Sequence, residues 1–293
     1  MGVQPLVGKT SVVQAGIEAV EGTLVPATVK LEILSETLST IATKAEDFGI
    51  RGSLQRYQDN SQVTRKDHTG EIVMMCRFGD IDFLSPAIFG GADGAYAQEA
   101  KTMSLEITRG ATTYMFTGVK IDEWSLDMSS GEAIKMTMNV VAYTRTTGTA
   151  TSGLDYTSEV PMTTDGATLT VDAVAREFHS LTFGVRRGID QDHFVNSIER
   201  TSAVSTEFTP FGSAELDYAE ATKDLIDICE SGDAEPVIVG ITDGSNPITF
   251  TMDTTAITGD QPTTSDMGVL KFPIEWTALQ TGSEDALVVA GLS

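Results

Sequence analysis

Apolar and polar residues alternate along most of the chain, and this pattern predicts strands rather than helices. The clearest case is residues 122–144, DEWSLDMSSGEAIKMTMNVVAYT. Trp124, Leu126 and Met128 alternate with polar residues up to a Ser-Ser-Gly-Glu turn. A second run then places an apolar residue at every even position from Ile134 to Ala142. The segment is therefore predicted to be a β-hairpin with one apolar face.

Helical periodicity is confined to two short stretches, 83–89 and 219–230. Pro86 fits the first stretch only in its opening turn. Further strands are predicted at 102–108, 113–121, 236–242, 248–257 and 267–279, and around Leu169–Val171 and Leu181–Val185. The fold class is accordingly mainly β with a little helix.

Residues 146–159, TTGTATSGLDYTSE, are almost free of apolar residues and have the composition of a linker or exposed loop. We therefore expect one β-domain over 1–145 and a second over 160–293. The order helix, strand, turn, strand, strand occurs on both sides of the linker, which favours a duplication. In that alignment Met136, Met138, Val140 and Ala142 correspond to Leu270, Phe272, Ile274 and Trp276.

Charge is the most pronounced bulk property: the net charge is −23 and it is uneven. Residues 1–146 hold 18 acidic and 13 basic residues, whereas 147–293 hold 24 and 6. An acidic surface gives solubility and does not bind nucleic acid phosphates. Abundant acidic residues also suit a protein that works at high salt concentration, where electrostatic screening is permanent. No run approaches the ~18 apolar residues of a membrane span, and no signal peptide is visible, so a soluble protein is expected.

Candidate chemistry is sparse. Cys76 and Cys229 lie 153 residues apart and form no motif; they could form a disulfide, but two core thiols are expected. The three histidines have no partner at metal-ligand spacing. No nucleophile elbow occurs, and no carboxylate pair stands out among 42 acidic residues. We expect no enzyme activity, no metal and no cofactor.

The predicted strands favour assembly instead. Small β-domains expose sheet edges, which are either protected or used for pairing. Pro273 cannot donate to a strand ladder, so the strand around it is expected to be an edge or to carry a bulge there. Edge strands that pair between subunits would close a ring of sheets, and a hairpin such as 122–144 would form part of its wall.

In several consecutive segments the chain resembles the tail tube (major tail) proteins of long-tailed bacterial and archaeal viruses, in their two-domain form. The resemblance rests on GIEAVEGTLVPATVKLEI at 16–33, RGSLQRYQDNSQVTRKDHTGEIVMMCRFGD at 51–80 and, most specifically, LEITRGATTYMFTGVKIDEWSLDMSSGEAIKMTMNVVAYT at 105–144. It continues through FHSLTFGVRRGID at 178–190 and ERTSAVSTEFTPFGSAELDY at 199–218. It covers nearly the whole chain as a pattern. The chain departs from it in the acidic second half.

The resemblance implies two tandem β-sandwich or split-barrel domains, each with a short helix. It implies rings of three copies, or six if the halves are not duplicates, stacked into a hollow tube for viral DNA. Inter-subunit contact is expected at the 51–70 loop and at five residues: Arg186, Arg187, Phe194, Trp124 and Pro273. Reversing Arg186 and Arg187 together is expected to weaken stacking but not folding. The implied partners are the chain itself and the tape-measure, tail terminator and baseplate proteins, with the protein soluble in the host cytoplasm before assembly and part of the virion afterwards.

Two alternatives stay open from the sequence. One is another β-rich assembly subunit of the tail-completion, sheath, fibre or pilus type, which would form a cap or solid fibre. The other is a carbohydrate-binding or hydrolytic β-sandwich, which would need exposed aromatic residues and a carboxylate pair.

Overall fold

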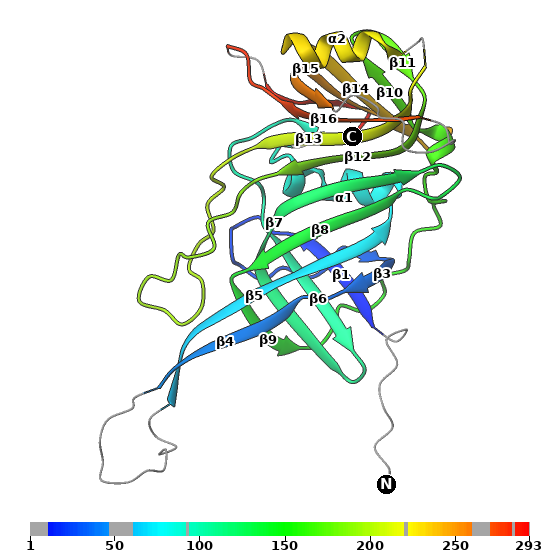
Figure 1. Ribbon diagram of the computed structural model, residues 1–293. Helices are drawn as coiled ribbons and strands as arrows, with labels where there is room; N and C mark the ends of the chain where they lie inside the picture. Colours follow the sequence, from blue (N-terminus) through cyan, green and yellow to red (C-terminus); the bar gives the residue numbers. More distant parts are fainter. Residues whose placement is uncertain are drawn as a thin grey trace.

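The computed structural model describes residues 11–46, 61–91, 94–219, 222–259, 270–282 and 285–292. Its fold is mainly β and antiparallel, as the alternation predicts (Figure 1). The first half contains β1 (Val12–Ile17), β2 (Val29–Leu31), β3 (Ile33–Glu36), β4 (Ser39–Glu46), β5 (Ser61–Met75), α1 (Phe78–Ile88), β6 (Met103–Arg109), β7 (Thr112–Ser129), β8 (Lys135–Ala142) and β9 (Thr144–Gly148). The second half contains the 3-10 turn η4 (Thr164–Gly166), β10 (Thr168–Val171), β11 (Val174–Arg176), β12 (Phe178–Arg186), β13 (Thr209–Asp217), α2 (Asp224–Ser231), β14 (Ala234–Thr242), β15 (Pro247–Gly259), β16 (Lys271–Ala278) and β17 (Val288–Ala290).

The hairpin predicted at 122–144 is confirmed. β7 and β8 pair antiparallel, with Asp127 opposite Lys135 next to the turn. β7 is longer than predicted, because 113–121 and 122–129 form one continuous strand. Its first part pairs with β6 and β9, and its second part pairs with β8 and β12. α1 starts earlier than the predicted 83–89 and α2 later than the predicted 219–230.

One hydrophobic core runs through both halves. At its centre lie four aromatic rings, two from the first half (Phe89, Trp124) and two from the second (Phe183, Phe250). The ring centroids lie 6.0 Å apart for Trp124 and Phe183, and 4.6 Å apart for Phe183 and Phe250. Ring pairs at these separations stabilise beyond the area they bury. The halves therefore meet through packed apolar side chains.

The two halves repeat the same strand pairings. Those of the first half are β1–β2, β1–β6, β4–β5, β5–β8, β6–β7, β7–β8 and β7–β9. They recur in the second half, in the same order, as β10–β11, β10–β14, β12–β13, β13–β16, β14–β15, β15–β16 and β15–β17. This supports the proposed division at 146–159, although part of that segment is strand β9 and pairs with β7.

A matching glycine and a matching bulge fix the register of the repeat. Gly70 on β5 lies opposite Val140, and Gly212 on β13 lies opposite Trp276. The β3–β5 pairing has a register shift, or bulge, between Ile33 and Ser35, and the β12–β13 pairing has one between Phe178 and Ser180. Together β3 and β4 thus correspond to β12.

The glycines also correct the alignment read from the sequence. Because Val140 corresponds to Trp276, Met136 corresponds to Phe272 and not to Leu270. The whole set is displaced by two residues.

Gly70→Ala is expected to destabilise the fold by about 1–3 kcal/mol, because overpacking costs this much. A Cβ at Gly70 would lie 2.3 Å from Leu38 Cα and 2.7 Å from the Thr37 carbonyl carbon, which are backbone atoms that cannot rotate away. The free energy of unfolding in urea measures the effect. Ser35→Ala, at an exposed position on the neighbouring strand, is the control, and equal stability of the two variants would contradict the close approach.

Candidate functional site

A polar surface runs unbroken across both halves on one side of the sheet β5–β8–β7–β12–β13–β16; α1 lies behind this sheet in the view of Figure 1. We call it the polar sheet face. Its positions on the first half are Glu71, Val73, Lys135, Thr137, Asn139, Glu123, Ser125, Asp127 and Ser129. Its positions on the second half are Ser180, Thr182, Gly184, Arg186, Thr209, Phe211, Ser213, Glu215, Asp217, Lys271, Pro273, Glu275 and Thr277.

The registers align these positions in rows across six strands. One row runs Val73, Thr137, Ser125, Gly184, Phe211 and Thr277. Residues of successive strands directly opposite each other point to the same side of a sheet. The intervening positions, such as Met138, Leu126, Phe183 and Ala214, are buried in the core. The sheet thus has one apolar face and one face of mostly small polar side chains.

The polar sheet face is acidic, with six carboxylates against three cations. Each cation pairs with a nearby acid. Arg186 donates to Glu123 at 2.8 Å, and this hydrogen bond raises the pKa of Arg186. Lys271 lies 3.4 Å from Asp217 and 3.6 Å from Glu215, and Lys135 lies 3.4 Å from Glu132.

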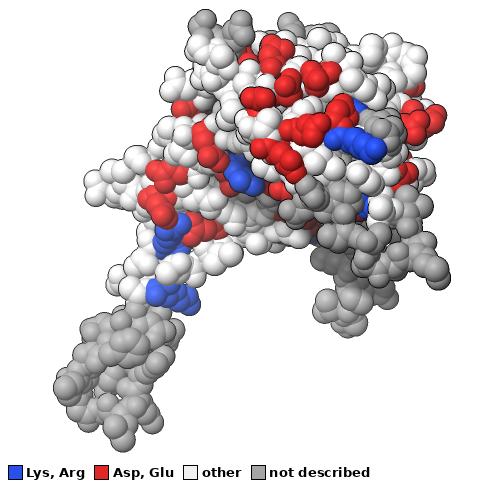
Figure 2. Space-filling view, turned by 45° about the horizontal axis from the view of Figure 1, so that its top comes forward, with Lys and Arg blue, Asp and Glu red and all other residues white. Residues whose placement is uncertain are grey.

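Asp217 has a second partner, His179, at 2.7 Å. Hydrogen bonds from His179 and from Lys271 hold the pKa of Asp217 below its usual value, so it is ionised at neutral pH. In Figure 2 acidic side chains also predominate on the surface of the second half, at the top of the view.

Arg187, next to Arg186, lies inside the protein. Its side chain is 1% exposed and donates to the carbonyl oxygens of Ile88 at 2.8 Å and of Ala97 and Gln98 at 3.2 Å. Burial lowers the pKa of Arg187 to about 10, so it stays charged at neutral pH. The guanidinium therefore joins the second half to the loop that follows α1.

Arg187 begins a long connection, residues 187–208, that we call the docked loop. It lies against the first half beside β5 (Figure 1). Lys120 donates to the Ala203 carbonyl, and the Ala203 N–H donates to the Tyr143 hydroxyl at 2.9 Å. Arg200 donates to the Ala142 carbonyl at 2.9 Å and to Asp67. Each side of this contact thus supplies a buried cation, Lys120 from the first half and Arg200 from the loop, that binds a backbone carbonyl of the other side.

Phe194 lies on the docked loop between two guanidinium groups, 4.3 Å from that of Arg65 and 5.4 Å from that of Arg200. Arg65 also donates to Asp67 and to Asp192, whose hydrogen bonds raise its pKa. Val195 and Ile198 nearby are 56% and 45% exposed. The loop therefore presents apolar side chains on a firmly held support.

The five candidate contact residues lie in different environments. Arg186 and Pro273 are on the polar sheet face, and Phe194 is half-buried on the docked loop. Trp124 and Arg187 are 1% exposed and make their contacts within the chain, so neither is proposed as a contact between subunits. Pro273 pairs with Glu215 on β13, while the described pairing to β15 begins one residue later, at Ile274. Residues 51–60 of the candidate loop lie outside the described residues.

His68 lies on β5, opposite Thr40 of β4, and its side chain is buried. Its Nδ1 is 2.9 Å from the Thr40 hydroxyl, and its ring packs edge-on against Phe116. Burial lowers the pKa of His68 to about 4.

Lowering the pH is therefore expected to reduce the free energy of unfolding through protonation of His68. The unfolded chain binds a proton near pH 6.5 that the folded chain excludes until about pH 4. This contribution, on the order of 3 kcal/mol, is complete above pH 6.5 and is lost as the pH falls toward 4. Urea unfolding of the wild type and of His68→Gln at pH 7.5 and 4.5 measures it. An identical loss in both proteins would contradict the assignment.

Two adjoining hollows of about 470 and 680 Å³ share Ser130 and residues 175–178. Two of the side chains that line them are engaged within the protein, since Arg176 pairs with Asp224 and His179 with Asp217. Among the described residues, no three His, Cys, Asp or Glu side chains are placed to hold a metal ion.

Comparison with known families agrees with this architecture. The profile of the phage tail tube protein family matches residues 8–278. The chain belongs to this family. A tail tube protein is a structural protein of the viral tail and associates with itself into a tube. No curated protein matches the chain. No helix in the described residues is long and apolar enough to cross a membrane.

Sequence reasoning did not find the polar sheet face of this tail tube protein. The signal was present as small polar residues in alternating positions, such as Ser125, Thr137, Thr182 and Ser213. Only the strand registers show that they share one surface.

Proposed function

We propose that the protein assembles into closed rings that stack into the hollow tail tube, with the polar sheet face lining the bore through which viral DNA passes. The observation that carries this proposal is the continuity of that face across both halves, together with the pairing of all its cations. A bore must let DNA slide without binding it. A surface of small polar and net acidic side chains does so, because it offers no free cations to displace phosphate counterions.

Ring formation follows from the sheet edges. A tube wall made of strands is stable in water when neighbouring subunits pair their edges, because a closed barrel leaves no edge exposed. The pseudo-repeat supports three copies per ring, each supplying two equivalent units, and six copies is the alternative if the units are not equivalent.

The segments that project from the sheet make the contacts between stacked rings. In Figure 1 the β4–β5 hairpin and the docked loop extend to the same side of the molecule, away from α2. Exposed Val195 and Ile198 lie on the docked loop. Tape-measure, terminator and baseplate proteins are the further partners such a tube requires.

Negative-stain electron microscopy of the concentrated protein tests the proposal. The expected result is hollow tubes whose end-on views show threefold or pseudo-sixfold symmetry. Caps or solid fibres would favour another kind of tail subunit. A uniform monomer at all concentrations, also in the presence of tail nuclei that initiate assembly, would overturn the proposal.

A further inference from the structure

The two halves of the chain meet along one strand junction, β7–β12. Seven pairs form its antiparallel register, from Glu123 opposite Arg186 to Ser129 opposite Ser180. This junction is the one pairing that joins the halves among the named strands of the described residues. It also continues the polar sheet face from one half to the next.

The internal repeat assigns a counterpart to each side of this junction. β12 corresponds to β3 and β4, because Leu38 takes the place of Phe183 beside the matched glycines Gly70 and Gly212. Ile41 therefore corresponds to Arg186, and Thr40 to Val185. The second part of β7 corresponds to the end of β15, since β7 and β15 make the same sequence of pairings.

The β7–β15 correspondence can be counted residue by residue. Glu123 pairs with Asn139 on β8, and Thr258 pairs with Glu275 on β16. Asn139 and Glu275 are equivalent in the register set by Val140 and Trp276. Glu123 therefore corresponds to Thr258, and Trp124 to Gly259.

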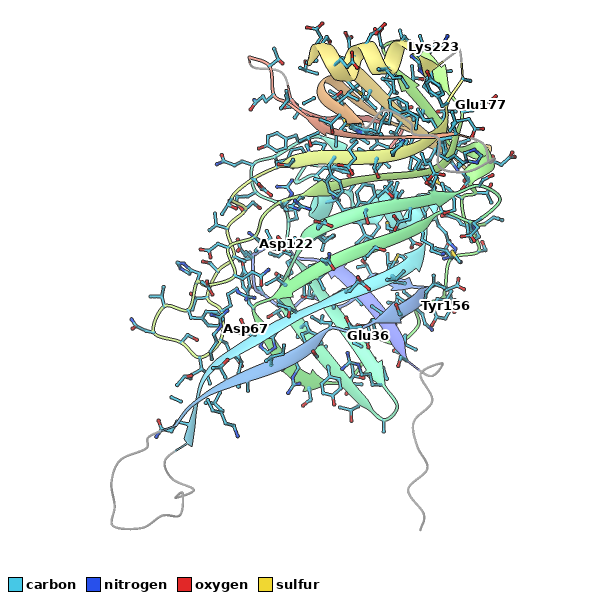
Figure 3. The ribbon with its side chains drawn as sticks, viewed as in Figure 1. Glu36, Asp67, Asp122, Tyr156, Glu177 and Lys223 are labelled. Atoms are coloured by element: carbon cyan, nitrogen blue, oxygen red, sulfur yellow. The ribbon has the colours of Figure 1, made fainter. Side chains whose placement is uncertain are left out.

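Both counterpart edges lack a neighbour within the described residues. β3 and β4 pair only with β5, and Thr258 and Gly259 pair only with β16. The β3–β4 edge also exposes two large apolar side chains, Leu34 at 53% and Ile41 at 59%. Figure 3 labels Glu36, which lies between them on this edge. An edge strand with exposed apolar residues is a template for pairing with another chain.

We infer that the β3–β4 edge of one copy pairs antiparallel with the end of β15 of the next copy and so repeats the β7–β12 junction between subunits. Ile41 then lies opposite Thr258 of the partner subunit, and Thr40 opposite Gly259 of the partner subunit. This inference rests on the proposed function and specifies the partner surface. Each copy carries one edge of each kind, so the contact is head-to-tail, the kind of contact that forms a ring when the rotation between successive copies closes.

The pairing also continues the polar sheet face around the ring. Ile41 lies opposite Asp67 and Thr258 opposite Glu275, which places both on the side of that face. Between subunits, Ile41 and Thr258 of the partner subunit, both β-branched, take the positions that Arg186 and Glu123 occupy as an ion pair in the internal junction. Such cross-strand pairs stabilise a sheet.

Disulfide trapping tests the register. Ile41→Cys and Thr258→Cys are introduced together with Cys229→Ser, and assemblies formed under reducing conditions are then oxidised. Residues directly opposite each other in an antiparallel pair have Cα atoms about 4.5–5.5 Å apart, which a disulfide can bridge. The matched control pairs Ile41→Cys with Ala256→Cys, an exposed residue on the same face two positions away. That diagonal is about 7–8 Å, beyond disulfide reach.

Three outcomes decide the inference. An interchain ladder from the 41/258 pair, at least tenfold stronger than from the 41/256 pair and ending at the ring copy number, supports it. Assemblies that form normally but show equal or no cross-linking in both pairs overturn the edge assignment and leave the proposed function standing. Failure of the wild type to assemble overturns both.

If the cysteine variants do not assemble, amide hydrogen exchange on the wild type tests independently whether the β3–β4 edge is paired in the tubes. Amides of residues 37–43 whose N–H groups face the free edge are expected to exchange at least tenfold more slowly in tubes than in the monomer. Unchanged exchange in assembled tubes would overturn the inference.

Discussion

Arg187→Glu is expected to destabilise the folded protein by about 3–5 kcal/mol, because removing one partner of a buried, hydrogen-bonded charge costs this much. The substitution replaces a donor that contacts three backbone carbonyls with a carboxylate that cannot donate to any of them. It also leaves the ring of Phe208, 5.0 Å from the guanidinium, without its cation. Urea unfolding at pH 7.5 measures the loss.

Arg186→Glu is the matched control. Arg186 is 53% exposed in its side chain, and its ion pair with Glu123 is of the kind that contributes at most about 1 kcal/mol. The double reversal, which from the sequence should weaken stacking alone, is now expected to lose the fold through Arg187. Equal stability of the two single variants would show that Arg187 does not hold the halves together.

The difference between these neighbours shows where sequence reasoning stops. Alternation recovers β7, β8 and β16 because their apolar positions follow the period of two that a half-buried strand requires. It cannot identify Arg187 as buried, because the carbonyls it contacts lie 89 to 99 residues earlier in the chain. A charged residue beside a Gly in a polar stretch gives no sign of such a distant partner.

The repeat shows a second limit. A period of two is unchanged when one run is moved by two residues along the other, so alternation alone admits both alignments of Met136. Gly70 and Gly212 decide between them. A side chain at Gly70 would meet the backbone of Thr37 and Leu38, and one at Gly212 would meet the Trp276 ring and the Thr182 carbonyl oxygen. The correspondence of β3–β4 to β12 was also missed, since Leu34, Ser35 and Thr37 follow no apolar alternation.

Reversing the charge of the polar sheet face is expected to make the assembled tubes retain DNA. Glu71→Lys with Glu275→Lys changes the face from a net of three negative charges to one positive charge per copy. Both residues are exposed on different strands, so the sheet and its core are expected to form as before. Unpaired lysines in the bore would then bind phosphates and release counterions.

Co-sedimentation of tubes with short double-stranded DNA, loaded during assembly, measures this retention. Wild-type tubes are expected to release the DNA at 50 mM salt, and the reversed tubes to hold it until the salt concentration is raised, because phosphate binding weakens steeply with salt. Asp253→Lys with Asp285→Lys makes the same change in charge at exposed positions outside the polar sheet face. If those tubes retained DNA equally, the net charge would explain the binding and this face would not be the bore. Retention by the face variant alone requires that the DNA path runs along β5 and β16, and therefore across both halves of every subunit.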